Sequence, residues 1–201
     1  MKAKLTTILF SCLFVSGCVF VDTHLNIDYD PIKAEESALS SAPSLKVEVE
    51  EFKDSRSENV LAYKNLAETG AVLTQKSMPE VMRTALLALL KKNGHVTDPL
   101  APQLIIGGEV KKMAMGFLPG VMTTEAVGHM VVRLNVKASN GKVIFTREYQ
   151  GEYHQRTAYA TMKVWKQVFN VALEDLMHNI AVDKGLLEVF LAQTKPSTKA
   201  A

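Results

Sequence analysis

Alternating apolar and polar residues predict several strands in the chain after residue 44. Residues 45–49 alternate between apolar and charged side chains, as expected for a strand with one buried face. Extended segments are also predicted over residues 104–113, 123–138 and 142–153. The dipeptide Asn140-Gly141 separates the last two segments and is typical of a two-residue type I′ turn. These three segments therefore predict an antiparallel meander.

Apolar residues at helical spacing predict two main helices. The first begins at Ser77, whose side chain can cap it, and ends near Gly94, which suits a left-handed stop. The second spans about residues 158–180, and its apolar positions, including Met162 and Trp165, predict a face buried in the core. The order of elements predicts an α+β domain, in which an antiparallel sheet of about four strands carries the two main helices on one face.

The amino terminus has a different pattern. Lys2 and Lys4 precede an apolar run over residues 5–15, which is too short to span a membrane as a helix. This pattern is typical of a secretory signal peptide. A buried amphipathic helix is the alternative, but it would need a polar face, and the few polar residues here are small.

The end of this run resembles the lipobox of bacterial lipoproteins. Val15 stands three residues before Cys18, and the intervening Ser16 and Gly17 are small. In lipoproteins such residues are recognised by the signal peptidase, which cuts before the cysteine after its thiol has received a diacylglycerol. The resemblance implies that residues 1–17 are a signal peptide and that Cys18 is the lipidation site and membrane anchor. Cleavage elsewhere, without lipidation, is the alternative.

Sorting and domain organisation follow from the residues after the cysteine. Residue 19 is valine rather than the aspartate that retains enterobacterial lipoproteins in the inner membrane, so this resemblance implies an outer-membrane location facing the periplasm. Residues 18–43 predict a flexible tether, residues 44–192 the α+β periplasmic domain with a short final helix from Asp183, and residues 193–201 a disordered tail.

Charge and residue spacing exclude several functions. The chain of 201 residues carries 23 basic and 21 acidic side chains, a net charge of +2, without the basic stripe of a nucleic-acid-binding protein. The five histidines lack zinc-binding spacing, and Gly107-Gly108 predicts a β-bulge rather than a nucleotide site. Four oxygen-bearing side chains in the tether lack the rest of a calcium loop, so a solvated acidic linker is preferred there: Asp22, Asn26, Asp28 and Asp30. We therefore predict no metal, no cofactor and no catalytic residue.

Two further sets of residues invite a functional interpretation. Glu148, Glu152 and His154 could form an acid–base set, but strand alternation places them on the solvated face. The segment 113–122 is apolar where a hairpin loop should be polar, which predicts contact with a partner or lipid through four of its residues: Met115, Phe117, Leu118 and Met122. The alternative is that Phe117 and Leu118 fold back onto the core of the domain.

The overall organisation resembles the YajG-type family of outer-membrane lipoproteins. The resemblance covers about residues 45–192 and rests on the following motifs: Gly94-His95-Val96, Leu104-Ile105-Ile106, Asn140-Gly141 followed by Lys142, and Ala172-Leu173-Glu174-Asp175-Leu176. It implies a small envelope domain without assigned catalytic residues. We therefore expect a lipid-anchored, non-enzymatic accessory or scaffold in envelope assembly or transport, with an envelope protein as partner. The alternatives are an envelope hydrolase and a module that binds a small ligand between helix and sheet.

Overall fold

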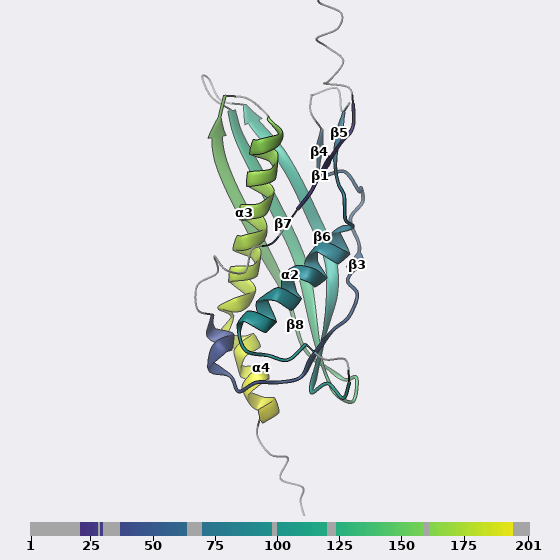
Figure 1. Ribbon diagram of the computed structural model, residues 1–201, viewed down its shortest axis with the longest axis vertical. Helices are drawn as coiled ribbons and strands as arrows, with labels where there is room; N and C mark the ends of the chain where they lie inside the picture. Colours follow the sequence, from purple (N-terminus) through teal and green to yellow (C-terminus); the bar gives the residue numbers. More distant parts are fainter. Residues whose placement is uncertain are drawn as a thin grey trace, which may run out of the picture.

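A long antiparallel meander forms the centre of the domain (Figure 1). The computed structural model describes residues 21–27, 29, 37–63, 70–97, 100–119, 124–158 and 161–194. Within them, β6 (Leu104–Pro119), β7 (Thr124–Ala138) and β8 (Val143–Thr157) pair in order, which confirms the predicted meander. β7 has the predicted length, whereas β8 is longer than predicted and β6 continues through the segment that we expected to form a loop after Met113.

The main sheet is mixed rather than purely antiparallel. β2 (Val47–Val49) and β3 (Lys53–Asp54) both pair with β6 in the parallel direction, which gives a five-stranded sheet. The prediction of an antiparallel sheet of about four strands is therefore correct for the α+β class and wrong in these details. Parallel neighbours such as β2 and β6 need a crossover connection, so the chain that joins them has room for a helix.

The described residues form three α-helices beside the sheet: α2 (Met78–Lys92), α3 (Met162–Ala181) and α4 (Lys184–Thr194). α2 packs against β6, whereas α3 lies along β7 and β8, and both helices share one hydrophobic core with the buried face of the sheet (Figure 1). Alternate residues of β7 point into this core, as the sequence predicted, and Trp165 of α3 is 1% exposed. A sheet with one solvated face buries the other in this way.

Local sequence explains where α2 begins and ends. The Ser77 side chain accepts a hydrogen bond from the Glu80 N–H at 3.3 Å, while Lys91 and Lys92 occupy the last turn, where the helix dipole favours cations. Gly94 follows with a φ of 83°, as predicted for a left-handed stop.

The turn between β7 and β8 differs from the predicted type I′ turn. The N–H of Gly141 donates to the carbonyl of Ala138, and the N–H of Ala138 donates to the carbonyl of Lys142, each at 2.9 Å. The loop therefore has three residues. Gly141 has a φ of 80°, whereas Asn140 does not adopt a positive φ, and its side chain accepts a hydrogen bond from the Lys142 N–H at 3.0 Å.

The prediction of a flexible tether over residues 18–43 is wrong for its described part. β1 (Thr23–Leu25) joins β5 (Ala71–Thr74) and β4 (Ala62–Tyr63) in a second sheet of three strands. Further along, the 3₁₀ helix η3 (Ala38–Ser41) buries Leu39 completely. The Ser37 hydroxyl donates to the Ala181 carbonyl at 2.9 Å, so this segment is fixed to the end of α3.

Gly107 and Gly108, which predicted a bulge, lie in a regular part of the strand pairing. The irregularity in the pairing of β6 and β7 lies between Val110 and Lys112, beyond Gly107 and Gly108. A Cβ atom at Gly108 would collide with the carbonyl oxygen of Arg133 and lie 3.0 Å from the Phe52 ring. Gly108 is therefore required for close packing between the strands and Phe52.

Gly151 of β8 provides a test of how tightly α3 packs against the sheet. A Cβ atom there would clash with the Ala172 carbonyl oxygen of α3 and lie 2.6 Å from Leu176 Cβ. We expect Gly151→Ala to lower the free energy of unfolding by about 2–3 kcal/mol, because the helix would have to move away from the sheet. Urea unfolding followed by the fluorescence of Trp165 measures this change.

The matched control is Gly116→Ala in β6, where no atom lies within 4 Å of the added Cβ. This variant should be unchanged or more stable by up to about 1 kcal/mol. Equal losses of stability in the two variants would contradict the importance of this contact.

Candidate functional site

The lipidation motif lies outside the described residues: Val15, Ser16, Gly17 and Cys18. Met122, which was predicted to contact a partner, also lies outside them. The first described residue is Val21, three positions after Cys18, and it is 61% exposed. The described residues closest in sequence to Cys18 therefore lie where β1 begins, and the candidate site is at that end of the domain.

The remaining predicted contact residues all lie in β6 but differ in how far they are exposed. Met115 is buried, so its predicted role in an exposed contact is wrong, because it occupies an inward-facing position of a strand rather than a loop. Phe117 is half-buried and packs edge-on against Trp165, with ring centroids 4.5 Å apart. Leu118 points outward and is 53% exposed. The structure thus supports core packing for Phe117 and leaves Leu118 on the surface.

The start of α3 contributes a second exposed apolar residue. Thr161 caps this helix, since its hydroxyl accepts a hydrogen bond from the Val164 N–H at 3.3 Å. Met162, which we predicted to face the core, is 36% exposed because the inward-facing residues of α3 begin with Trp165. Lys163 and Lys166 are exposed beside it.

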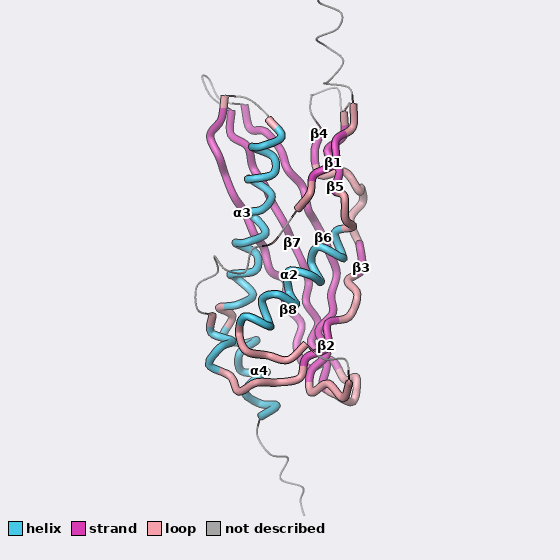
Figure 2. The backbone as a smooth tube through the Cα atoms, in the orientation of Figure 1, coloured by secondary structure: helices cyan, strands magenta, loops and turns pink. Residues whose placement is uncertain are grey.

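Strand pairing brings the start of β1 to the same level as the end of β6. The Met115 N–H donates to the Leu61 carbonyl at 2.6 Å, just before β4. β4 then pairs with β5, where Ala62 lies opposite Val72, and Val72 pairs with Thr23 of β1. Figure 2 shows the start of β1, the end of β6 and the start of α3 at one end of the elongated molecule. We call this the hairpin end, represented by five exposed residues: Val21, Leu118, Met162, Lys163 and Lys166.

The possible acid–base set lies on the solvated face of the sheet, as predicted. Glu148 accepts hydrogen bonds from Arg133, and His154 Nε2 lies 2.9 Å from Glu152 Oε1. This contact lowers the pKa of Glu152 and raises the pKa of His154. The glutamate and histidine therefore favour the charged forms of a surface ion pair, whereas an acid–base couple needs pKa values close to the working pH.

Asp183 lies at the centre of a buried polar cluster. The sequence predicted that the final helix starts at this residue, but it did not predict the cluster. The Asp183 carboxylate accepts hydrogen bonds from Arg147 Nη1 at 2.7 Å and from the Tyr149 hydroxyl at 2.6 Å, both on β8. It also accepts the N–H groups of Gly185 and Leu186, which caps α4. Burial raises the pKa of Asp183, but these hydrogen bonds outweigh it and hold the pKa below its usual value.

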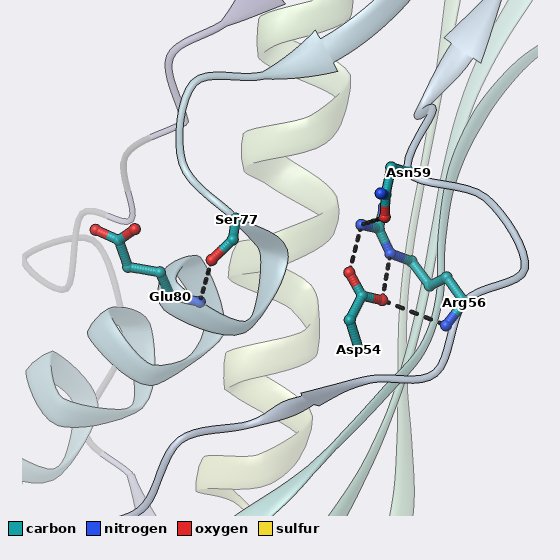
Figure 3. Close-up of polar contacts among 5 residues, drawn as sticks. All are labelled: Asp54, Arg56, Asn59, Ser77 and Glu80. Atoms are coloured by element: carbon teal, nitrogen blue, oxygen red, sulfur yellow. Dashed lines mark hydrogen bonds and ion pairs between the residues drawn. The ribbon is translucent and has the colours of Figure 1, made fainter.

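A second polar cluster lines a cavity of about 450 Å³ at the start of α2. Asp54 accepts hydrogen bonds from Arg56 Nε and Nη2 at 2.8 and 2.7 Å, and Nη2 also contacts Asn59 (Figure 3). The Arg56 side chain is only 7% exposed. Its Nη1 atom has no hydrogen-bond partner among the residues that the structure describes. Ser77, at the start of α2, lines the same cavity.

The acidic residues near the amino terminus were predicted to lie in a solvated linker rather than at a calcium site. Asp22 accepts a hydrogen bond from the Ala71 N–H at 2.9 Å and so joins β1 to β5. Asp28 and Asp30 lie outside the described residues. Within the described ranges, no group of three or more His, Cys, Asp or Glu side chains is placed to hold a metal ion.

Comparison with protein families decides the class of protein. A family model described as an uncharacterized lipoprotein matches residues 32–190. The chain belongs to this lipoprotein family. No curated protein matches the sequence. Among the described helices of the lipoprotein, none has the length and apolar composition needed to cross a bilayer.

Several solved structures are similar to this lipoprotein, and the first of the three that follow shares its fold. XCC0632 from Xanthomonas campestris is 10% identical with a TM-score of 0.61, over 86% of this chain and 100% of that one. A minor lipoprotein from Acinetobacter baumannii is 14% identical with a TM-score of 0.46, over 68% of this chain and 88% of that one. A putative neuraminyllactose-binding hemagglutinin homolog from Helicobacter pylori is 13% identical with a TM-score of 0.45, over 82% and 97%.

The Asp183 cluster of the lipoprotein makes its stability depend on pH. We expect Asp183→Asn to lose about 2 kcal/mol at pH 7, because charged hydrogen bonds to β8 and α4 are removed. Since the folded-state pKa of Asp183 is lowered, its contribution is full above the unfolded-state pKa of about 3.9 and is lost as the pH falls through the folded-state pKa. Urea unfolding at pH 7 and below pH 4 measures both effects.

Tyr149→Phe is the matched control, since it removes one hydrogen bond to Asp183 and keeps the carboxylate. This variant should lose about 1 kcal/mol and keep the acid-dependent loss of stability. Unchanged stability of Asp183→Asn at pH 7 would show that the cluster is energetically neutral.

Proposed function

We propose that this lipoprotein is attached through lipid on Cys18 to the periplasmic side of the outer membrane, where it serves as a non-enzymatic accessory or scaffold in envelope assembly or transport. The observation that carries the proposal is a lipobox-like sequence directly before Cys18 in a member of a lipoprotein family. Val19 supports the outer membrane through the sorting resemblance. The narrower likeness to YajG-type lipoproteins is part of the same proposal.

Lipid attachment is physically sufficient to hold such a domain. Each buried methylene contributes about 0.8 kcal/mol, so one acyl chain binds a membrane reversibly, whereas two or three chains bind it stably. Removal of residues 1–17 would take away Lys2 and Lys4 and leave equal numbers of basic and acidic side chains. Attachment through the lipid would therefore not rely on a net positive charge.

Surface chemistry supports an accessory role over the alternative of an envelope hydrolase. Glu148 and Glu152 are 45% and 56% exposed, and each is paired with a basic side chain on the open face of the sheet. A glycoside hydrolase needs a general acid whose pKa is raised, whereas the pKa of Glu152 is lowered. The proposed partner is a protein of the envelope, which an anchored domain would meet at the membrane.

Substitution of the anchor tests this proposal in living cells. We expect Cys18→Ala to abolish palmitate labelling, to release the chain from outer-membrane fractions, and to remove its cross-links to envelope proteins, because the acyl attachment is lost. Cys12→Ala is the matched control, since Cys12 lies within the predicted signal peptide and should not affect labelling. Continued palmitate labelling of Cys18→Ala would refute the anchor, and intact cross-links in the released chain would refute its need for the membrane.

The cavity beside Arg56 favours a second candidate function, binding of a small anionic ligand. The buried guanidinium has two N–H groups on Nη1 directed to no described acceptor. A carboxylate or phosphate oxygen would satisfy them, because guanidinium groups bind planar oxyanions well. Lys76 and the amino-terminal end of α2 line the same cavity and favour negative charge.

Thermal shifts with succinate and inorganic phosphate test this second function. A ligand at about a hundred times its Kd should raise the melting temperature by about 5–10 °C, and Arg56→Gln should abolish the shift. Arg133→Gln is the matched control, because Arg133 is also paired with a carboxylate but lies on the open face of the sheet. Absence of a shift with either anion, or equal shifts in both variants, would argue against a site at Arg56.

A further inference from the structure

The short distance between the anchor and the domain restricts how the domain can lie on a membrane. Two residues, Val19 and Phe20, lie between Cys18 and Val21, the first described residue, so the two ends are three Cα–Cα steps apart. Whatever conformation they adopt, the chain spans at most about 11 Å. If Cys18 carries the lipid, as proposed above, Val21 lies within that distance of the bilayer surface. The hairpin end, which includes Val21, must then be the end nearest the lipid.

The hairpin end has the exposed apolar residues that a lipid contact requires. Val21, Leu118 and Met162 are 61%, 53% and 36% exposed. They come from three separate parts of the chain, just before β1, near the end of β6 and at the start of α3, and these elements lie together at this end (Figure 1). Apolar side chains at a membrane surface insert to a depth of about 5–10 Å, which the ends of strands and helices can reach without unfolding.

The charges of the hairpin end also suit a membrane surface. Lys163 and Lys166 are exposed in the first turns of α3. A helix dipole favours acidic residues and disfavours cations at this end. α3 shows the opposite pattern, since its first turn contains no acidic residue. α2 of the same chain obeys that rule, with Glu80 at its start and two lysines at its end. Lysines beside exposed apolar residues can bind anionic headgroups while their stems lie on the lipid.

Two acidic side chains near the hairpin end, among the residues that the structure describes, already interact with other groups of the protein. Asp22 accepts a hydrogen bond from the Ala71 N–H, and Glu125 Oε1 lies 3.4 Å from His154 Nδ1. Both interactions reduce the repulsion that these carboxylates would exert on anionic lipid headgroups. The exposed charges of the described residues at this end, Lys163 and Lys166, therefore favour anionic phospholipid.

We propose that the hairpin end is a second membrane contact, in which Leu118 and Met162 enter the headgroup region and Lys163 and Lys166 bind anionic phospholipids. This inference rests on the proposed anchor at Cys18 and adds an orientation to it. The long strands would stand away from the membrane, and the Asn140-Gly141 turn would lie at the distal end. β6 extends over 16 residues, so the two ends are separated by roughly 50 Å.

A fluorescent probe at each end distinguishes the two orientations. Leu118→Cys and Val143→Cys form a matched pair, because the native side chains are 53% and 50% exposed and Val143 lies at the distal end beside Lys137. The acylated mature chain offers no other free thiol, since Cys18 is modified and Cys12 is removed. Each variant, labelled with an environment-sensitive NBD dye, is placed in vesicles of phosphatidylethanolamine and phosphatidylglycerol that contain spin-labelled phospholipid.

We expect the probe at Leu118 to be blue-shifted and quenched several-fold more strongly than the probe at Val143. Met162→Cys is a second probe of the hairpin end in case Leu118→Cys does not fold. Replacing phosphatidylglycerol by phosphatidylcholine, or combining Lys163→Gln with Lys166→Gln, should reduce the quenching. Equal quenching at both ends, or none at Leu118 and Met162 in a chain that floats with the vesicles, would overturn the membrane contact while the anchor stands. The anchor itself would be overturned if the chain purified from membranes with native Cys18 carried no acyl groups and did not float with the vesicles.

Discussion

The close packing of α3 against β7 and β8 is the constraint on which the rest of the structure depends. Two glycines permit it: a Cβ atom at Gly128 would lie 3.0 Å from Val168, and one at Gly151 would meet the backbone of α3. The helix can therefore lie along the long strands and bury Trp165 and Phe169 between them. Trp165 in turn covers Phe117, so the same contact determines which residues stay exposed at the hairpin end.

Local patterns predicted much of the fold because the long elements are strongly periodic. The meander, α2, α3 and the final helix all follow from alternation, helical spacing and capping residues such as Ser77 and Asp183. The short parallel pairings did not follow, because β1 and β3 contain three and two residues and depend on distant partners. The turn after Ala138 was mistaken in type because Asn140 can bond its side chain to the Lys142 N–H without a positive φ.

The candidate site was predictable only in part, for a related reason. The proposed lipidation site at Cys18 leaves a local pattern, because the signal peptidase of lipoproteins reads a short sequence that needs no fold. The exposure of Leu118 and the burial of Met115 depend on the register of β6, since neighbouring positions of a strand face opposite sides. The Asp183 cluster and the cavity at Arg56 join residues that are far apart in the sequence, and neither leaves a local pattern.

The direction of β1 has a mechanical consequence. β1 begins five residues after Cys18 in the sequence and runs parallel to β5, with Thr23, His24 and Leu25 each paired to a residue of that strand. If Cys18 is the anchor, as proposed, a force that pulls the domain away from the envelope would act along β1 and load all three pairs together in shear. The strand could then not be separated one hydrogen bond at a time, so the first strand that the structure describes after the proposed anchor would resist tension.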